Sequence, residues 1–322
     1  MGDGTEKNPY TRKDVLKLIK ENGGTAKGLD LSGKIFEEGI DLSVLNLERI
    51  ILKKASLHRA HLEKANLFQA HLEEADLWWS HLEEVEMAEA HLQESNLSGA
   101  YLERATLFGA HLEGAVLVIT KLEGASFSGA HLKGVSLWAA KFSSDTELEN
   151  VDWGDYILAE ERELREAKGE AREECLANWA IDNVYRRLKL WYANAGMSDT
   201  AAKFYFREKE AERKCAKRRR DRVAGWLSWA FFGHGEGWKR ILFWIAGFVL
   251  FFALIYFAIG TLTPNTFLNS LYYSAVSFIA LGYGSWVKEA TGWVKGLGVF
   301  ETFLGFFMMT LLLVTFVRKW TR

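Results

Sequence analysis

Three consecutive residues in the last quarter of the chain, Gly282-Tyr283-Gly284, could bind a cation through backbone oxygens. Glycine adopts backbone conformations that are closed to other residues, so consecutive carbonyl groups can point in one direction. Rings of such carbonyls replace the water shell of an ion inside a pore. We therefore expect the carbonyl oxygens of Leu281, Gly282 and Tyr283 to coordinate a dehydrated cation.

Two apolar runs flank this stretch and would position it. Residues 241–260 and 296–317 are each long enough for a helix that crosses a bilayer, which takes about 20 residues. Between them, residues 267–279 predict a shorter amphipathic helix that leads into the glycines. Irregular backbone at membrane depth is tolerated only where it lines a cavity or is buried in protein. This order of segments indicates a cation-channel pore, and because one glycine loop cannot surround an ion, it predicts a homotetramer.

The same segments resemble the pore of the two-transmembrane-helix potassium channels. Leu281-Gly282-Tyr283-Gly284 is similar to that family's filter, which usually reads Thr-Val/Leu-Gly-Tyr-Gly-Asp. Two positions depart from the pattern: Ala280 replaces the threonine of the innermost ion site, and Ser285 replaces the aspartate above the filter. The resemblance implies conduction of potassium or other monovalent cations, and the missing hydroxyl leaves the choice between them open.

The resemblance also implies residues that support the filter. Tyr272 and Tyr273 occupy the positions of an aromatic pair that braces the filter from behind. Glu301 resembles the family's acidic residue behind the filter, and we expect it near Tyr272 or the filter backbone. An acidic group inside a membrane span is usually functional or paired.

The second apolar run contains candidate gating residues. Gly305 resembles the family's hinge glycine, although a small residue there could instead permit close helix packing. Leu312 and Phe316 lie one turn apart and could close an apolar gate. The chain lacks the arginine-bearing helix of a voltage sensor. Gating would therefore come from the cytosolic segments that precede the two spans, from membrane tension or from a ligand.

A second strong signal is an apolar residue at every fifth position from Leu42 to Phe142, preceded two positions earlier, from Ala55 on, by a small residue, with Val85 an exception. A period of five fits neither helix nor strand and indicates an internal repeat. The pattern, clearest at Ala65-Asn66-Leu67 and Ala75-Asp76-Leu77, resembles the pentapeptide-repeat family. The resemblance implies a right-handed quadrilateral β-helix with four pentapeptides per turn. Stacking about five such turns would bury a continuous core.

Histidines precede the central leucines at spacings of ten residues. With twenty residues per turn, one ladder would stack on one face and another on the opposite face. The first ladder is His71, His91, His111 and His131; the second is His61 and His81, followed by Tyr101 and Lys121. The histidine ladders have three interpretations: a surface ladder without function, a metal site, or a stripe that responds to pH. Glu residues lie two positions after several of the histidines and would partly screen their charge. Trp78 and Trp79 could form a contact patch or pack on a neighbouring subunit.

The remaining sequence completes a multidomain organisation. Leu31 and Phe36 predict an irregular first turn, and Thr11 with Asp14 predicts a capped helix before it. The segment before the membrane resembles a single tetratricopeptide-type helical hairpin. Its basic end, 214–222, is expected either to form a solvated helix face or to bind anionic lipid headgroups. The expected domains are 1–30 (helix and cap), 31–156 (β-helix), 157–222 (helical hairpin), 223–238 (interfacial helix and turn) and 239–322 (pore, with helices at about 240–260 and 296–318).

Composition limits the remaining possibilities. The net charge of −2 argues against a general nucleic-acid binder, and Cys175 and Cys215 lack metal-ligand spacing. The first residues contain no apolar run, which predicts no signal peptide.

Basic residues beside both spans predict a multi-pass protein of the plasma or inner membrane with cytosolic termini. We expect no enzymatic activity and no cofactor beyond permeant ions. A membrane-anchored scaffold, or a sensor whose repeat domain binds an unknown ligand or protein, remains the alternative.

Overall fold

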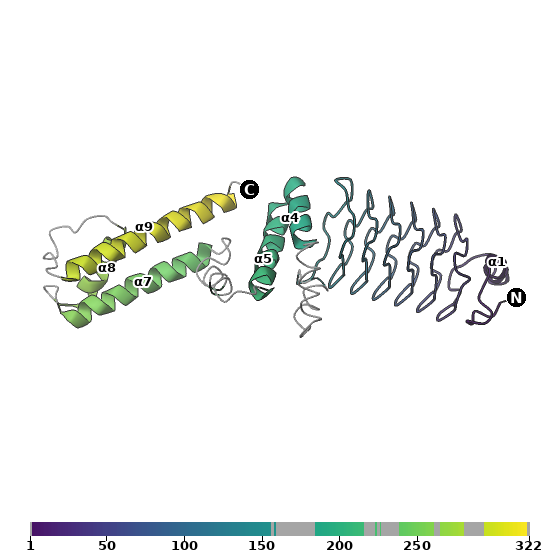
Figure 1. Ribbon diagram of the computed structural model, residues 1–322, viewed down its shortest axis with the longest axis horizontal. Helices are drawn as coiled ribbons and strands as arrows, with labels where there is room; N and C mark the ends of the chain where they lie inside the picture. Colours follow the sequence, from purple (N-terminus) through teal and green to yellow (C-terminus); the bar gives the residue numbers. More distant parts are fainter. Residues whose placement is uncertain are drawn as a thin grey trace. The chain divides into compact units, whose positions relative to one another are not determined.

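The computed structural model describes residues 2–155, 158, 184–215, 223, 226, 238–260, 265–279 and 293–320. Its helices are α1 (Arg12–Glu21), α4 (Val184–Asn194), α5 (Ser198–Cys215), α7 (Trp238–Ile259), α8 (Phe267–Ile279) and α9 (Trp293–Trp320) (Figure 1). The chain divides into two units, Met1–Trp191 and Tyr192–Arg322, which are described separately below.

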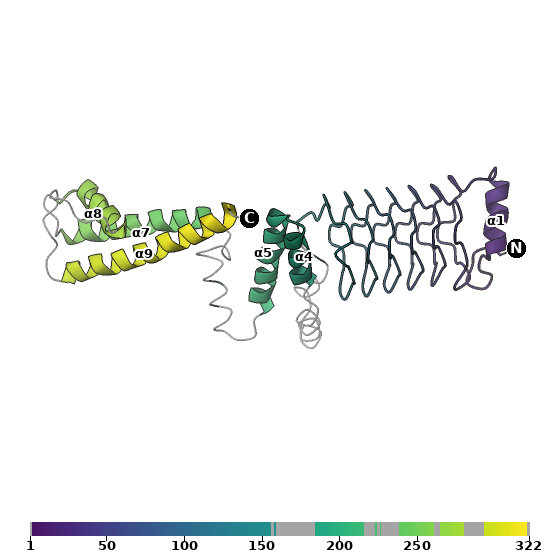
Figure 2. The ribbon, with the colours of Figure 1, turned by 90° about the horizontal axis from the view of Figure 1, so that it is seen from above.

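The first unit is a rod of stacked turns (Figure 2). Parallel β-bridges join residues twenty positions apart, as in His61 with His81 and Asn66 with Glu86. Bridges recur at every fifth residue, which confirms four pentapeptides per turn. At the two ends the step is one residue longer, because Asp30 pairs with Ile51 and His131 pairs with Asp152. The irregular first turn is therefore confirmed, and the last turn has the same irregularity.

Each side of a turn buries one large and one small side chain, as the repeat predicts. Leu62, Ala65 and Leu67 are all 0% exposed. At each corner the chain turns through a residue with positive φ, such as Lys64 at 56°, and glycine takes this position in many later turns. Gly99 has a second reason to be glycine, because a Cβ there would lie 2.6 Å from the indole of Trp79. Trp79 thus packs on the next turn of its own chain.

Both ends of the rod are covered. At the N-terminal end, Thr11 and Asp14 form the predicted capping box of α1, and Val15 is buried. At the other end the core continues past the periodic repeat, through Leu148 and Trp153. Phe142, the last periodic position, is only partly buried and lies under the guanidinium of Arg187 at 5.1 Å.

The start of α4 contacts the last turns of the rod. Arg187 donates hydrogen bonds to the carbonyls of Ala140 and Leu137, and Trp191 Nε1 donates to the carbonyl of Ser143 at 3.2 Å. The first helix of the predicted hairpin 157–222 is thus described only from Val184, since residues 159–183 lie outside the described part. These contacts join the helical segment to the end of the repeat.

The second unit begins with the end of α4 and α5, where Tyr192 stacks on the buried Phe204 at 5.6 Å. α5 begins at Ser198 and is described to Cys215. Most of the predicted interfacial segment 223–238 lies outside the described residues. α7 and α9 then contain two segments with the length and composition of membrane-crossing helices, Lys239–Ile259 and Gly296–Val317. They match the two predicted spans, and α8 coincides with the predicted half-helix 267–279.

Candidate functional site

The half-helix α8 packs against both α7 and α9. Near its middle, the buried Tyr273 meets Tyr256 of α7 edge to face, with ring centroids 4.9 Å apart. Near its end, Phe278 joins a cluster with Ile241 of α7 and Met308 of α9. These contacts fix both the position and the direction of the helix that leads into Gly282-Tyr283-Gly284.

Glu301 links the three helices through a buried polar cluster. The side chain is 0% exposed, and one carboxylate oxygen accepts a hydrogen bond from the Tyr256 hydroxyl at 2.9 Å. The other oxygen is hydrogen-bonded to the Ser274 hydroxyl of α8, which also lies 2.8 Å from the carbonyl of Val249. The hydrogen bonds of Glu301 go to Tyr256 and Ser274, whereas the filter backbone, which with Tyr272 was the expected neighbour, lies outside the described residues. Sequence reasoning missed both hydroxyl partners, although isolated hydroxyls in apolar helices are a usable signal.

The last turn of α8 rests directly on α9. The Thr302 hydroxyl donates to the carbonyl of Ser277 at 2.9 Å. At Gly305, a Cβ would overlap the carbonyl group of Phe278. Gly305 therefore permits close packing of two helices, and its role as a hinge remains a prediction. Since Gly305 lies near the middle of the span Gly296–Val317, the C-terminal end of α8 lies near mid-span.

The other predicted pore residues divide into two groups. Ala280, Leu281, Gly282, Tyr283, Gly284 and Ser285 lie outside the described residues. Of the described ones, Tyr272 is 45% exposed in the single chain, whereas Tyr273 is buried. Leu312 packs against the Phe278 cluster, and Phe316 is exposed. The two residues proposed as a gate thus have different surroundings within one chain.

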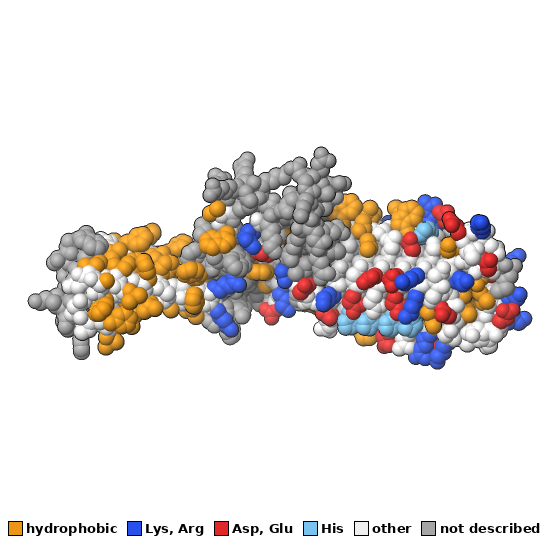
Figure 3. Space-filling model, turned by 90° about the horizontal axis from the view of Figure 1, so that it is seen from below, with side chains coloured by type: hydrophobic (Ala, Val, Ile, Leu, Met, Phe, Trp, Pro, Cys, Tyr) orange, Lys and Arg blue, Asp and Glu red, His pale blue; other side chains and the backbone are white. Residues whose placement is uncertain are grey.

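The histidine ladders of the rod are formed as the spacing predicts. We call His71, His91, His111 and His131 the 71 ladder, and His61, His81, Tyr101 and Lys121 the 61 ladder. Successive rings stack at 4.6–5.1 Å with interplanar angles of 1–6°. Lys121 Nζ continues the 61 ladder 4.3 Å from the centre of the Tyr101 ring. Histidine side chains form a continuous band along one surface of the rod (Figure 3).

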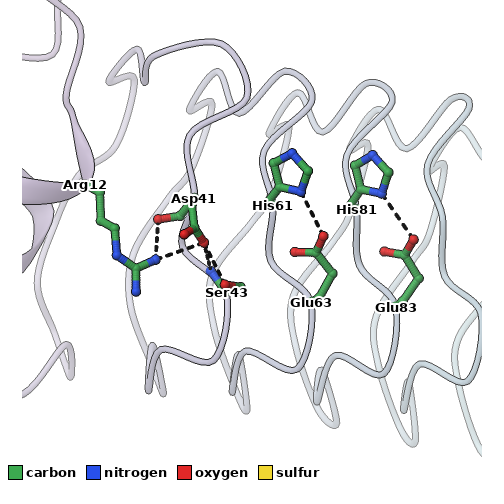
Figure 4. Close-up of polar contacts among 7 residues, drawn as sticks. All are labelled: Arg12, Asp41, Ser43, His61, Glu63, His81 and Glu83. Carbon is green, nitrogen blue, oxygen red and sulfur yellow. Dashed lines mark hydrogen bonds and ion pairs between the residues drawn. The ribbon is translucent and has the colours of Figure 1, made fainter.

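Carboxylates accompany the ladders. Nδ1 of His61 lies 2.8 Å from Glu63, and Nδ1 of His81 lies 3.1 Å from Glu83 (Figure 4). In the 71 ladder, burial lowers the pKa of His91, and the neighbouring His71 lowers this pKa further. Both effects favour the neutral imidazole at His91, whose nitrogen can accept a proton or a metal ion.

The Trp patch predicted at the edge of the rod is held within its own chain. Trp78 meets His58 edge to face and lies under the guanidinium of Arg59, while Trp79 packs on Gly99 and near Tyr101. Each indole remains 38% exposed. A neighbouring subunit is thus not needed to hold these side chains.

Comparison with known proteins agrees with this division of the chain. A family model described as "Ion channel" matches residues 244–322. A model described as "Pentapeptide repeats" matches in eight copies, within residues 70–109, 86–118 and 110–144. A search of curated proteins gave no match. The second unit therefore contains the ion channel domain of a membrane protein. In this chain that domain is joined to a pentapeptide-repeat domain.

Solved structures similar to the chain are pentapeptide repeat proteins. Rfr23 from the cyanobacterium Cyanothece 51142 is 25% identical, with 44% of this chain and 99% of that chain covered and a TM-score of 0.24. A protein from the Arabidopsis thaliana thylakoid lumen is 31% identical (38% and 74% covered, TM-score 0.16). QnrB1, a plasmid-mediated fluoroquinolone resistance protein, is 22% identical (40% and 71% covered, TM-score 0.25). Because these TM-scores are all well below 0.5, the solved structures do not support the assignment of the repeat. That assignment rests on the sequence pattern and the β-bridges.

Proposed function

We propose that the protein is a homotetrameric cation channel that conducts potassium or other monovalent cations through its Gly282-Tyr283-Gly284 filter. The observation that carries the proposal is the position of α8. Its last turn is held near mid-span by Thr302 and Gly305 of α9, immediately before the glycine motif. A half-helix that ends at this depth and continues into glycines is what a carbonyl-lined filter requires.

The charge of the half-helix supports a cation as the permeant ion. The C-terminal end of a helix carries a partial negative charge from its unpaired carbonyls. Four copies of α8 arranged around an axis would direct these ends at one cavity below the filter. The carbonyls of Leu281, Gly282 and Tyr283 would then coordinate the ion in the filter itself.

Assembly is supported by the apolar surface of the spans. In the single chain, Phe243 of α7 and Phe303 of α9 are each 73% exposed, and Phe306 is 71% exposed. Exposed apolar surface of this extent marks contact with lipid or with other protein. We assign part of it to the bilayer of a plasma or inner membrane and part to neighbouring subunits. The repeat domain would then lie in the cytosol, as an assembly or regulatory domain.

Ion flux from liposomes that contain the purified protein tests the proposal, with potassium and sodium on opposite sides. We expect a cation current, and its reversal potential reports the selectivity left by Ala280. Gly282→Ala should abolish the current, whereas Gly247→Ala should preserve it, because a Cβ at Gly247 meets no atom within 4 Å. Unchanged current in Gly282→Ala would refute the filter assignment. A tetramer without any current would support the membrane-anchored scaffold instead.

A further inference from the structure

The two histidine ladders differ in the residue that lies two positions after each histidine. In the 71 ladder these residues are Glu73, Gln93, Glu113 and Lys133. In the 61 ladder, His61 and His81 are followed by Glu63 and Glu83. Three clusters in the described part of the chain bring two histidines and a glutamate together. Of these, the cluster around His61 and His81 has a glutamate beside both rings.

The geometry of this cluster is close to that of a metal site. The rings of His61 and His81 stack at 4.7 Å, and each Nδ1 faces its own glutamate (Figure 4). Ligand atoms of His61, Glu63 and His81 all lie within 4.8 Å of one another. Ligands of a tetrahedral Zn²⁺ lie about 2.0–2.2 Å from the ion and hence roughly 3.3 Å apart. The His61 and His81 side chains are 44% and 33% exposed, so both rings have room to turn toward an ion.

Charge also favours a cation at this position. One oxygen of Glu63 and one of Glu83 are buried without a hydrogen-bond partner among the described residues, and Glu103 and Glu123 continue the same edge. Lys121 pairs with Glu103 at 3.7 Å, one turn beyond Glu83. Arg59, the nearby cation, is paired with Glu38 at 2.8 Å. The carboxylates beside His61 and His81 thus have imidazoles as their partners rather than ammonium or guanidinium groups.

The equivalent pair of the 71 ladder has the same stacking but different charge. His71 and His91 also stack at 4.7 Å. However, Glu73 already carries an ion pair with Lys53 at 3.0 Å, and Gln93 replaces the second carboxylate. In the third cluster, Asp152 supplies the carboxylate beside His131, with its Oδ2 3.3 Å from Nδ1, but Lys133 stands at the position that corresponds to Glu83 and its charge acts on Asp152. Thus the second cluster has one carboxylate fewer, and in both the second and the third cluster a lysine acts on a carboxylate, whereas the carboxylates beside His61 and His81 have no such partner among the described residues.

We propose that His61, Glu63, His81 and Glu83 bind one divalent transition-metal ion, with Zn²⁺ as the probe. Imidazole nitrogen with carboxylate oxygen suits Zn²⁺, whereas Mg²⁺ and Ca²⁺ prefer oxygen ligands alone. An open groove of about 450 Å³, lined by both histidines together with Glu38, Arg59, Trp79 and Tyr101, leaves the two rings accessible from solvent on one side. Because imidazole lone pairs lie in the ring planes, binding must tilt the two rings out of their parallel stack.

Calorimetric titration of the full chain with ZnCl₂ tests the site, in detergent and with an affinity tag free of histidine. We expect one tight site per chain, unaffected by excess Mg²⁺. His81→Gln should weaken this binding about tenfold or more. His91→Gln is the matched control, because His91 has the same stacking distance in the other ladder; it should leave the affinity within about twofold of the wild type. Glu83→Gln should weaken binding in the same direction as His81→Gln.

The outcomes distinguish a specific Zn²⁺ site at His61 and His81 from a general affinity of stacked histidines for Zn²⁺. Equal losses in His81→Gln and His91→Gln would overturn the assignment, as would a wild type that binds no more tightly than His81→Gln. Thermal unfolding followed by circular dichroism checks that each variant keeps its rod. If His81→Gln unfolds, Glu83→Gln decides alone, and unchanged affinity in that variant overturns the proposal. None of these readouts depends on conduction, so the result is independent of the proposed channel.

Discussion

The rod and the helical pore unit bury their apolar side chains in different ways. In the rod, central leucines such as Leu92 are 0% exposed within one chain. In α7 and α9, large side chains such as Phe243 and Phe303 remain 73% exposed. The rod therefore covers its core in a single copy, whereas the helical unit leaves apolar surface of the kind that lipid or other protein covers. The two regions should respond differently to the same kind of substitution.

The largest effect is expected in the core of the rod. Leu92→Ala removes a buried side chain in the middle turns and should reduce the free energy of unfolding of the rod by about 2–5 kcal/mol. Chemical denaturation followed by circular dichroism measures this change. Leu16→Ala, at a side chain that is 42% exposed, is the control and should have little effect. If the two variants were equally stable, the rod would not be the self-sufficient core described above.

An intermediate effect is expected where α8 meets α9. Gly305→Ala adds a methyl group against the Phe278 carbonyl, and overpacking of this kind costs about 1–3 kcal/mol. We expect the proposed tetramer to dissociate on mild heating in detergent and ion flux to be reduced, with unfolding of the rod unchanged. Gly247→Ala adds the same methyl group where no atom lies within 4 Å, and it should behave as the wild type. Identical behaviour of the two alanine variants would refute the close packing as a determinant of the pore.

The smallest effect is expected at the N-terminal cap. Hydrogen bonds from the backbone and side chain of Thr11 hold the pKa of Asp14 below its usual value. Because the pKa is lower in the folded state, the stabilisation is present at neutral pH. It is lost as the pH falls below the unfolded-state value of about 4 and through the folded pKa. The protection of the Val15 amide against hydrogen exchange, taken relative to the intrinsic exchange rate at each pH, should therefore fall in acid. Asp14→Asn should show low protection already at neutral pH and less further change in acid; a loss of protection in acid equal to that of the wild type would exclude Asp14 as its source.

Sequence predicted the rod better than it predicted the contacts of the pore. A repeat fixes which residues meet, because every contact recurs at a separation of twenty residues. The capping box of Thr11 and Asp14 is likewise local. By contrast, Glu301 meets Tyr256 and Ser274 across 45 and 27 residues, and no periodicity connects these positions. Such contacts depend on the packing of particular helices, which spacing alone does not determine.

The ladders show a different limit of sequence reasoning. The pattern places His61 and His71 in equivalent positions on opposite faces, and both stack as predicted. The difference between Glu83 and Gln93 was visible in the sequence. Its meaning depended on knowing that Glu73, unlike Glu63, is bound to a lysine of the preceding turn.

Because each turn of the rod takes twenty residues, the number of residues in the rod sets both its length and the rotation of one end relative to the other. Removing twenty consecutive residues from its regular part, such as 76–95, would shorten the rod by about 4.8 Å and leave the two ends in the same rotational phase. Removing ten residues would turn one end by half a revolution relative to the other. Variants of the first kind would change only the length between the caps, and variants of the second kind would change mainly their orientation. The repeat thus allows distance and direction to be altered separately in one protein.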